Sequence, residues 1–276
     1  MSTVPFTKMH GAGNDFVVID LRAHPFDLSA DTYSAIADRH RGIGCDQIIL
    51  IEPPQNGADL RFRFHNADGS EAGACGNGAR CAASKVMAET GVDALSIETR
   101  ATVLEANRAA DGEVTVDMGP AHTDWEAIPL SKAMQTDDLP DLIDGFSGPV
   151  AVGMGNPHCV FFVDDAEAVD IETHGPAIEH HPLFPERTNV EFVSPLGDNR
   201  MRMRVWERGV GVTLACGSGV CAVVVAAVQR GLIDGRSAEI VADGGILSAT
   251  WREDGHVLLT GPVATSFLGT FESNLA

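Results

Sequence analysis

The sequence is poor in basic residues. It has 19 lysines and arginines against 39 acidic residues among 276, a formal net charge of −20. Nucleic acids and anionic membranes both require a basic protein surface, so neither is expected as a partner. No apolar stretch approaches the roughly 20 residues that cross a bilayer. The first ten residues also lack the charged and then apolar pattern of a signal peptide, which favours a cytoplasmic location.

The usual cysteine and glycine motifs are missing as well. None of the six cysteines forms the C-x-x-C pair typical of redox proteins. Zinc sites need about two to four residues between ligands; the interval from Cys75 to Cys81 is too long, and that from Cys216 to Cys221 lies at the edge. No Gly-x-Gly continues into a nucleotide-binding loop or a phosphate-binding lysine. We therefore expect no metal and no cofactor.

The sequence does contain one short motif, or phrase, that occurs twice. Residues 75–81 read CGNGARC and residues 216–221 read CGSGVC, about half the chain apart. Glycine allows a tight turn and a close approach to a ligand. The N-terminus of a following helix binds carboxylates and lowers the pKa of a nearby thiol. Each phrase can thus supply a reactive thiol together with a carboxylate cradle.

Two such thiols favour stereochemical inversion. If Cys75 and Cys216 flank one carbon, one can take a proton from one face while the other delivers a proton to the opposite face. A racemase or epimerase needs two such groups, and cysteine is easily tuned to a working pH near neutrality. The other four cysteines are expected to be structural: Cys45, Cys81, Cys159 and Cys221.

The pattern of elements predicts an α+β protein made of two similar halves. Many short segments alternate apolar and polar residues, which is typical of strands. Helices are predicted over 30–39, 79–90 and 220–230, the last two ending at glycine. The predicted domains are 1–119, carrying Cys75 and completed by a final strand within 264–276, and 120–263, carrying Cys216.

Eight segments, in this order, resemble the diaminopimelate epimerases over nearly the whole chain. They are KMHGAGNDF (8–16), DRHRGIGCDQ (38–47), FHNADGSE (64–71), CGNGARC (75–81), GMGNPHC (153–159), FPERTN (184–189), WERG (206–209) and ACGSG (215–219). One departure is Val212, where the family often has an acidic residue. The resemblance implies two halves, each a curled, mostly antiparallel sheet around a central helix, with the active site in the cleft between them.

The resemblance also implies a reaction and the residues that perform it. The reaction is cofactor-independent interconversion of LL- and meso-2,6-diaminopimelate, in lysine and peptidoglycan precursor biosynthesis, by a homodimer. By the family's convention Cys75 donates and Cys216 accepts the proton from LL to meso. His158 and Glu207 match positions that tune the cysteines. The substrate-binding positions are Asn14, Gln47, Asn66, Gly76, Asn77, Asn156, Asn189, Glu207, Arg208, Gly217 and Ser218.

Two other functions stay open at this point. A related two-cysteine epimerase could act on proline or hydroxyproline, but that substrate would leave Glu207 and Arg208 without a distal ammonium and carboxylate to bind. A thiol-based redox or metal-binding protein would need no substrate at all. For a single buried cysteine the inert role is the more common one, and the duplication of the phrase is what favours catalysis.

Overall fold

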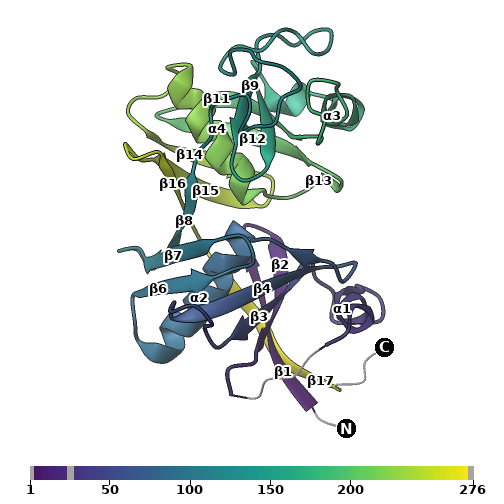
Figure 1. Ribbon diagram of the computed structural model, residues 1–276, viewed down its shortest axis with the longest axis vertical. Helices are drawn as coiled ribbons and strands as arrows, with labels where there is room; N and C mark the ends of the chain where they lie inside the picture. Colours follow the sequence, from purple (N-terminus) through teal and green to yellow (C-terminus); the bar gives the residue numbers. More distant parts are fainter. Residues whose placement is uncertain (1–2, 24–27, 273–276) are drawn as a thin grey trace. The chain divides into compact units, whose positions relative to one another are not determined.

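The computed structural model describes residues 3–23 and 28–272 of the chain (Figure 1). The chain divides into two compact units: unit 1 comprises Met1–Val116 and Gly261–Ala276, and unit 2 comprises Asp117–Thr260. The predicted α+β class is confirmed, since short strands dominate each unit and helices are few. Among the described residues, none of the helices has the length and apolarity to cross a membrane.

Unit 1 is a mostly antiparallel sheet with two helices. Its helices are α1 (Ala30–Ala37) and α2 (Gly76–Thr90). Its strands are β1 (Thr3–Gly11), β2 (Asn14–Asp20), β3 (Gln47–Glu52), β4 (Leu60–Asn66), β5 (Glu71–Ala72), β6 (Ala94–Glu98), β7 (Val103–Arg108), β8 (Val114–Pro120, which runs into unit 2) and β17 (Ala264–Glu272). The pairs β2–β3 and β4–β6 are parallel.

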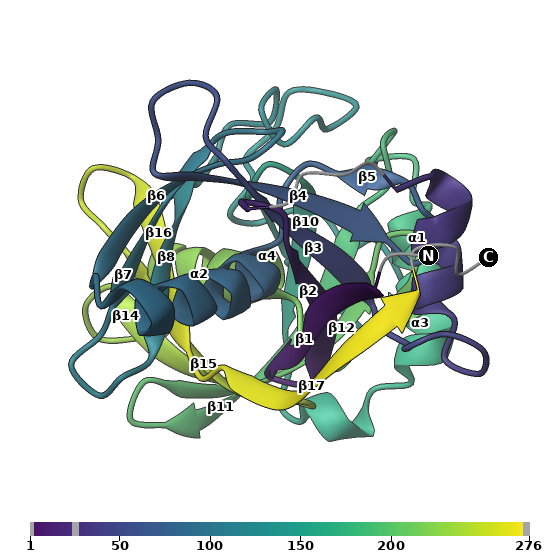
Figure 2. The ribbon, with the colours of Figure 1, turned by 90° about the horizontal axis from the view of Figure 1, so that it is seen from below.

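The last strand of the chain pairs with the first. Strand β17 lies antiparallel beside β1, as Figure 2 shows, with Val4 opposite Phe271. A final strand in the first half is what the sequence analysis predicted for 264–276; the last four of those residues lie outside the described part.

Unit 2 repeats the arrangement. Its helices are α3 (Ile171–Glu179), α4 (Gly217–Gln229) and a short 3-10 turn, η1 (Ala166–Ala168). Its strands are β9 (Val150–Gly153), β10 (Pro157–Phe162), β11 (Asn189–Gly197), β12 (Arg200–Glu207), β13 (Gly211–Val212), β14 (Ser237–Ala242), β15 (Gly245–Trp251) and β16 (His256–Gly261).

The strand pairings of the two units follow one scheme. In unit 2, β10–β11 and β12–β14 are parallel while β9–β10, β11–β12, β12–β13, β14–β15 and β15–β16 are antiparallel. The strands β1 to β8 of unit 1 pair in the same order of parallel and antiparallel neighbours as β9 to β16 of unit 2. The prediction of two similar halves is therefore confirmed by topology, although the halves share little residue identity.

One helix forms the core of each unit. Helix α2 packs against β1, β2, β3, β6 and β7, and α4 packs against β9, β10, β11, β14 and β15. The sequence of α4, GSGVCAVVVAAVQ, has the β-branched residues of a strand. It is nevertheless helical, because a helix surrounded by a curled sheet buries an apolar surface on all its sides. Residues 220–227 are all buried.

The two central helices begin three residues earlier than predicted. The expected starts were residues 79 and 220, but α2 begins at Gly76 and α4 at Gly217. Cys75 and Cys216 are the N-cap residues, each with an extended backbone and a sulfur that accepts a backbone N–H. The Gly-x-Gly phrase is therefore the first helical turn itself and not a loop that precedes the helix.

Sequence reasoning missed strand β1 and helix α3, as well as the short elements β5, β13 and η1. Strand β1 contains Pro5, which lacks the N–H that a ladder requires and so weakens a strand prediction. Helix α3 contains Gly175 and Pro176, both poor helix formers. Gly175 is needed there because a Cβ at this position would lie 2.5 Å from the indole of Trp206.

Candidate active site

The first turn of α2 surrounds the sulfur of Cys75. The backbone N–H of Gly78 donates to Cys75 Sγ at 3.4 Å, and the thiol faces Asn14 Oδ1 at 4.0 Å. Asn77 Nδ2 donates to the same Asn14 oxygen at 3.3 Å. The thiol is partly exposed. The structure thus brings Asn14 to Cys75 and Asn77, which the sequence analysis had selected from a segment about 60 residues away.

Asn14 is itself held by a charged network. Its Nδ2 donates to Asp46 Oδ2 at 2.7 Å, so its oxygen is left to face Cys75. Asp46 Oδ1 accepts from Arg39 at 2.7 Å, and Arg39 also donates to Asp15. Lys8 pairs with Asp15 on its other side. Burial alone would raise the pKa of Asp15, but hydrogen bonds from Arg39 and Lys8 outweigh burial and lower that pKa to about 2.

This network gives a pH-dependent prediction for Asp15→Asn. Because its ion pairs hold the folded pKa of Asp15 below the ordinary value of about 3.8, the charged form stabilises the fold by about 2 kcal/mol above pH ~4. This contribution is lost as the pH falls toward about 2. Urea unfolding should show the variant about 2 kcal/mol less stable at pH 7 and progressively closer to the parent below pH 4. The exposed control Glu105→Gln should change stability by less than about 0.5 kcal/mol. A pH-independent deficit for Asp15→Asn would contradict the argument.

Gln47 and Asn66 lie at adjacent ends of paired strands. Gln47 begins β3, Asn66 ends β4, and the two are register partners. Gln47 Nε2 donates to Asn66 Oδ1 at 2.9 Å. Gln47 Oε1 is buried and has no hydrogen-bond partner among the described residues. An unsatisfied buried acceptor beside a proposed binding site suits a ligand that brings a donor, such as an ammonium group.

The first turn of α4 surrounds Cys216 in the same way. The N–H of Gly219 donates to Cys216 Sγ at 3.4 Å, and the Ser218 hydroxyl lies 3.5 Å from the sulfur. Cys216 is only 6% exposed, and burial, with the carboxylates of Glu207 and Glu191, raises its pKa well above the ordinary value. Burial and the two carboxylates therefore disfavour the thiolate form of Cys216.

Glu207 lies beside this thiol at the end of β12. It accepts a hydrogen bond from the Thr213 hydroxyl and another from the Cys216 thiol. Burial raises the pKa of Glu207 above its ordinary value. A carboxylate in contact with the sulfur can govern its protonation, which is the role that the resemblance implied for this position.

The amides of Asn156 and Asn189 are both engaged. Asn156 Nδ2 donates to Ser218 Oγ at 3.4 Å, and its Oδ1 faces His158 Nε2 at 3.0 Å. Asn189 Nδ2 donates to the Pro157 carbonyl, and its Oδ1 accepts the backbone N–H of Arg208. Asn189 thereby fixes the backbone that carries Arg208, whose guanidinium is partly exposed.

Corresponding positions of the two units carry the candidate residues. Each unit places one at the start of its second strand, one at the start of its third, one at the end of its fourth and a cysteine at the cap of its central helix. In unit 1 these are Asn14, Gln47, Asn66 and Cys75; in unit 2 they are Asn156 (one residue before the strand), Asn189, Glu207 and Cys216.

Comparison with known proteins now identifies the family. A model of the diaminopimelate epimerase family matches residues 6–123 and 150–266. The chain belongs to the diaminopimelate epimerase family. Diaminopimelate epimerase of Rhodospirillum centenum is 55% identical over 271 residues, covering 98% of this chain and 93% of that protein. The enzyme of the same name from Acidiphilium cryptum is 54% identical over 269 residues, covering 98% and 96%. The prediction of an isomerase is confirmed.

Solved structures share the fold of this diaminopimelate epimerase family member. A phenazine biosynthesis protein of the PhzF family from Bacillus anthracis superposes with a TM-score of 0.70 at 14% identity, covering 99% of this chain and all of that one. A hydroxyproline epimerase from Agrobacterium vitis gives 0.68 at 16% identity, covering 97% and 92%. These likenesses concern the fold alone, so they do not favour the proline or hydroxyproline alternative.

Four cysteines of this family member are buried, as predicted. Burial raises the pKa of both Cys45 and Cys81 to about 12 and that of Cys159 well above its ordinary value. Cys221 is also fully buried. Such thiols stay protonated at neutral pH and react slowly.

Sequence reasoning missed two residues at the site, Arg80 and Glu191. Arg80 is fully buried and donates to the Asn77 side chain at 2.7 Å and to the Pro262 carbonyl at 3.2 Å. The sequence feature that could have indicated Arg80 is the length of the first phrase, which has one residue more than the second. Glu191, also fully buried, lies 2.6 Å from His158 Nδ1. Its signal is a lone acidic residue inside the apolar strand 190–193.

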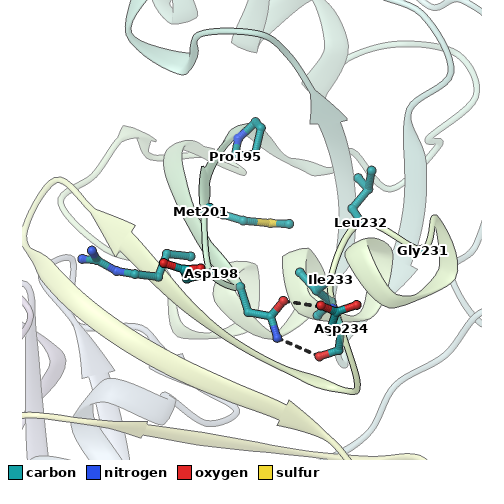
Figure 3. Close-up of a pocket in the computed structure, with 10 residues that line it drawn as sticks. Pro195, Asp198, Met201, Gly231, Leu232, Ile233 and Asp234 are labelled. Atoms are coloured by element: carbon teal, nitrogen blue, oxygen red, sulfur yellow. Dashed lines mark hydrogen bonds between the residues drawn. The ribbon is translucent and has the colours of Figure 1, made fainter.

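A pocket elsewhere in unit 2 contains none of the candidate residues. It has a volume of about 270 Å³ and lies where the turn between β11 and β12 meets the segment after α4 (Figure 3). There Asn199 Nδ2 donates to the Asp234 carbonyl at 2.7 Å, and the Asp234 N–H donates back to Asn199 Oδ1 at 2.9 Å. These bonds join the turn to the segment, and we assign them a structural role.

Val212, the departure from the family pattern, lies in the short strand β13. It pairs with Trp206 of β12 and is 42% exposed. An apolar residue at this exposed position alters the surface near the end of β12.

Proposed function

We propose that the protein interconverts LL- and meso-2,6-diaminopimelate by transferring protons between two cysteines and one α-carbon. The observation that carries the proposal is that Cys75 and Cys216 occupy the same position in two halves of one topology. Each caps the N-terminus of the central helix, with a backbone N–H donated to its sulfur. We place the two thiols on opposite faces of the substrate.

The helix ends supply the binding site for the reacting carboxylate. The first backbone N–H groups of any helix lack an intrahelical partner, and the helix dipole is positive at that end. Gly76 and Asn77 of α2, and Gly217 and Ser218 of α4, provide such groups. A carboxylate held there also draws electron density from its α-carbon, which makes the α-proton easier to remove.

The distal end of the substrate carries one ammonium and one carboxylate group. Arg208 can bind the carboxylate with two parallel hydrogen bonds. Gln47 Oε1 is a buried acceptor available to an ammonium proton. Asn66, Asn156 and Asn189 offer both donors and acceptors, which can distinguish the handedness of the distal centre. Proline and hydroxyproline have no such distal groups.

The reaction requires only acid and base. One sulfur accepts the α-proton as a thiolate, and the other, as a thiol, protonates the opposite face, so the thiol and thiolate exchange places in each turnover. From LL to meso, Cys75 is the donor and Cys216 the acceptor; the roles reverse in the other direction. Proton transfer changes no oxidation state, so we propose that the enzyme uses no cofactor. We also propose that it acts in the cytoplasm as a homodimer.

Incubation with LL-diaminopimelate in deuterated water tests the proposal. We expect meso product carrying solvent deuterium at one α-carbon, from reduced protein without any added cofactor. L-Proline and trans-4-hydroxy-L-proline, tested alongside, should neither epimerise nor exchange. Absence of exchange with LL-diaminopimelate would refute the proposed function, and exchange with proline alone would favour the alternative substrate class.

A further inference from the structure

Unit 2 buries an ionisable pair where unit 1 has apolar residues. His158 and Glu191 are both 0% exposed, and His158 Nδ1 lies 2.6 Å from Glu191 Oε1. In β10 and β11, His158 is the register partner of Asn189. In the corresponding strands of unit 1, Phe16 is the register partner of Gln47. His158 and Glu191 thus correspond to Phe16 and Ile49.

Ile49 and Glu191, which occupy corresponding positions, lie under the same turn of their central helices. A Cβ added to Gly78 would lie 2.9 Å from Ile49 and 3.2 Å from Phe16. A Cβ added to Gly219 would lie 2.9 Å from Glu191 Oε1 and 3.3 Å from Cys216 Cβ. Unit 1 shows that the topology is satisfied by apolar side chains at these two positions. The polar pair is therefore not required by the fold, and a buried ion pair of this kind is a weak source of stability.

A chain of hydrogen bonds leads from this pair to the catalytic sulfur. His158 Nε2 lies 3.0 Å from Asn156 Oδ1, and Asn156 Nδ2 donates to Ser218 Oγ at 3.4 Å. Ser218 Oγ lies 3.5 Å from Cys216 Sγ. All five residues belong to unit 2, and four successive contacts join Glu191 Oε1 to the sulfur.

The chemistry of the donors gives the chain one direction. An amide oxygen only accepts, so His158 Nε2 carries a proton. The short contact between His158 Nδ1 and Glu191 Oε1 then requires a second proton, and the pair holds two protons with no net charge. The Ser218 oxygen accepts from Asn156, which leaves its own proton to be donated to Cys216 Sγ.

We propose that Glu191 is a positioning residue that, through His158 and Asn156, aims the Ser218 hydroxyl proton at the sulfur of Cys216. Without Glu191, neutral His158 is free to carry its proton on Nδ1 instead. Asn156 would then turn its NH₂ toward His158 and its oxygen toward Ser218, and Ser218 would donate to Asn156. The sulfur would lose the donor that stabilises its thiolate.

Glu191 has a second, opposite effect that the test must separate. Although the His158–Glu191 pair is neutral as a whole, the Glu191 carboxylate helps to raise the pKa of Cys216. Removing Glu191 should by this effect alone make Cys216 more reactive. Loss of the aimed hydroxyl should make Cys216 less reactive. The charge effect of Glu191 persists when Ser218 lacks its hydroxyl, whereas the effect through the hydrogen-bond chain does not. A double-mutant cycle therefore distinguishes the two effects.

The experiment compares Glu191→Ile, the residue of unit 1, in the parent, Ser218→Ala and Ser218→Thr backgrounds. Iodoacetamide labelling of Cys216 is measured by peptide mass spectrometry from pH 6 to 10, with Cys75 in the same samples as reference. We expect Glu191→Ile to slow Cys216 labelling about tenfold more in the parent background than in the Ser218→Ala background. A factor of about ten corresponds to one hydrogen bond to a charged group. Ser218→Thr keeps the hydroxyl and should behave as the parent, with Cys75 labelling unchanged.

The same factor for Glu191→Ile in all three backgrounds would overturn the proposal. If Glu191→Ile does not fold, the double variant His158→Phe/Glu191→Ile, which reproduces the packing of unit 1, replaces it in the cycle with the same expectation. The inference rests on the proposed function for the role of Cys216, but labelling reads the thiol without turnover. A failed cycle would leave the epimerase proposal standing, and an inactive protein would still give a readable cycle.

Discussion

Cys75→Ser and Cys216→Ser are each expected to abolish epimerisation, with a loss of at least about 10³-fold. Positioned acid and base groups contribute roughly 10²–10⁴-fold, and a serine hydroxyl is far too weak an acid to replace a thiol near neutral pH. Serine is the better choice than alanine here because it is a strong N-cap residue, so α2 and α4 keep their caps. Turnover of LL-diaminopimelate, followed by chiral chromatography, measures the effect.

Two buried cysteines supply the matched controls. Cys81→Ala and Cys221→Ala change thiols that are fully buried one turn into the same helices. We expect them to lower stability by about 1 kcal/mol and to keep turnover within a fewfold of the parent. Comparable loss of activity in the controls and in the serine variants would show that any change in these helices disables the protein, and would contradict the two-thiol mechanism.

Arg80→Ala is expected to lower the free energy of unfolding by about 3 kcal/mol, through a cavity and the loss of two buried hydrogen bonds. Among the described residues, Arg80 is the largest fully buried side chain. It joins Asn77 in the first turn of α2 to Pro262, just before β17. The loss should also lower turnover, because Asn77 belongs to the proposed carboxylate cradle. Urea unfolding and steady-state kinetics measure the two effects.

Two further substitutions separate the causes. Arg80→Met keeps most of the side-chain volume, so its deficit of about 1–2 kcal/mol should report the hydrogen bonds alone. Lys85→Met, in the same helix, keeps most of the side-chain volume and removes an ion pair with Glu89 at i, i+4, so it should cost less than about 0.5 kcal/mol. A stability of Arg80→Ala equal to that of Lys85→Met would refute the anchoring role of Arg80.

The sequence predicted the class of the fold and most of its strands. Alternation of apolar residues predicts strands directly, as for Leu60–Asn66 and Arg200–Glu207. Glycines 91 and 231 gave the helix ends correctly. The starts of α2 and α4 were misplaced because cysteine is not a usual N-cap residue, and only the backbone geometry shows that sulfur accepts the first N–H groups. Strand β1 and helix α3 were not predicted because Pro5 and Pro176 are unfavourable inside a strand and a helix.

The candidate residues came from the repeated phrase and from the family pattern, and their contacts came from the fold. Asn14 and Cys75 are 61 positions apart, and Asn156 and Ser218 are 62 apart; sequence spacing gives no reason for either pair to meet. Pairing of β2 with β3, and of β10 with β11, brings the strand ends to the cap of each central helix. Glu191 in particular reads from sequence as one acidic residue in a strand.

The sequence by itself determined that two thiols lie in like local settings. The duplicated Cys-Gly-x-Gly phrase is a local pattern, so it can be recognised even though the rest of the two halves differs in sequence. Only the tertiary structure decided that the surroundings of these thiols differ. Under α2 lie Phe16 and Ile49, and under α4 lie His158 and Glu191. Residues distant in sequence set burial, charge and hydrogen-bond direction, so the sheet register, and not the phrase, makes each cysteine chemically distinct.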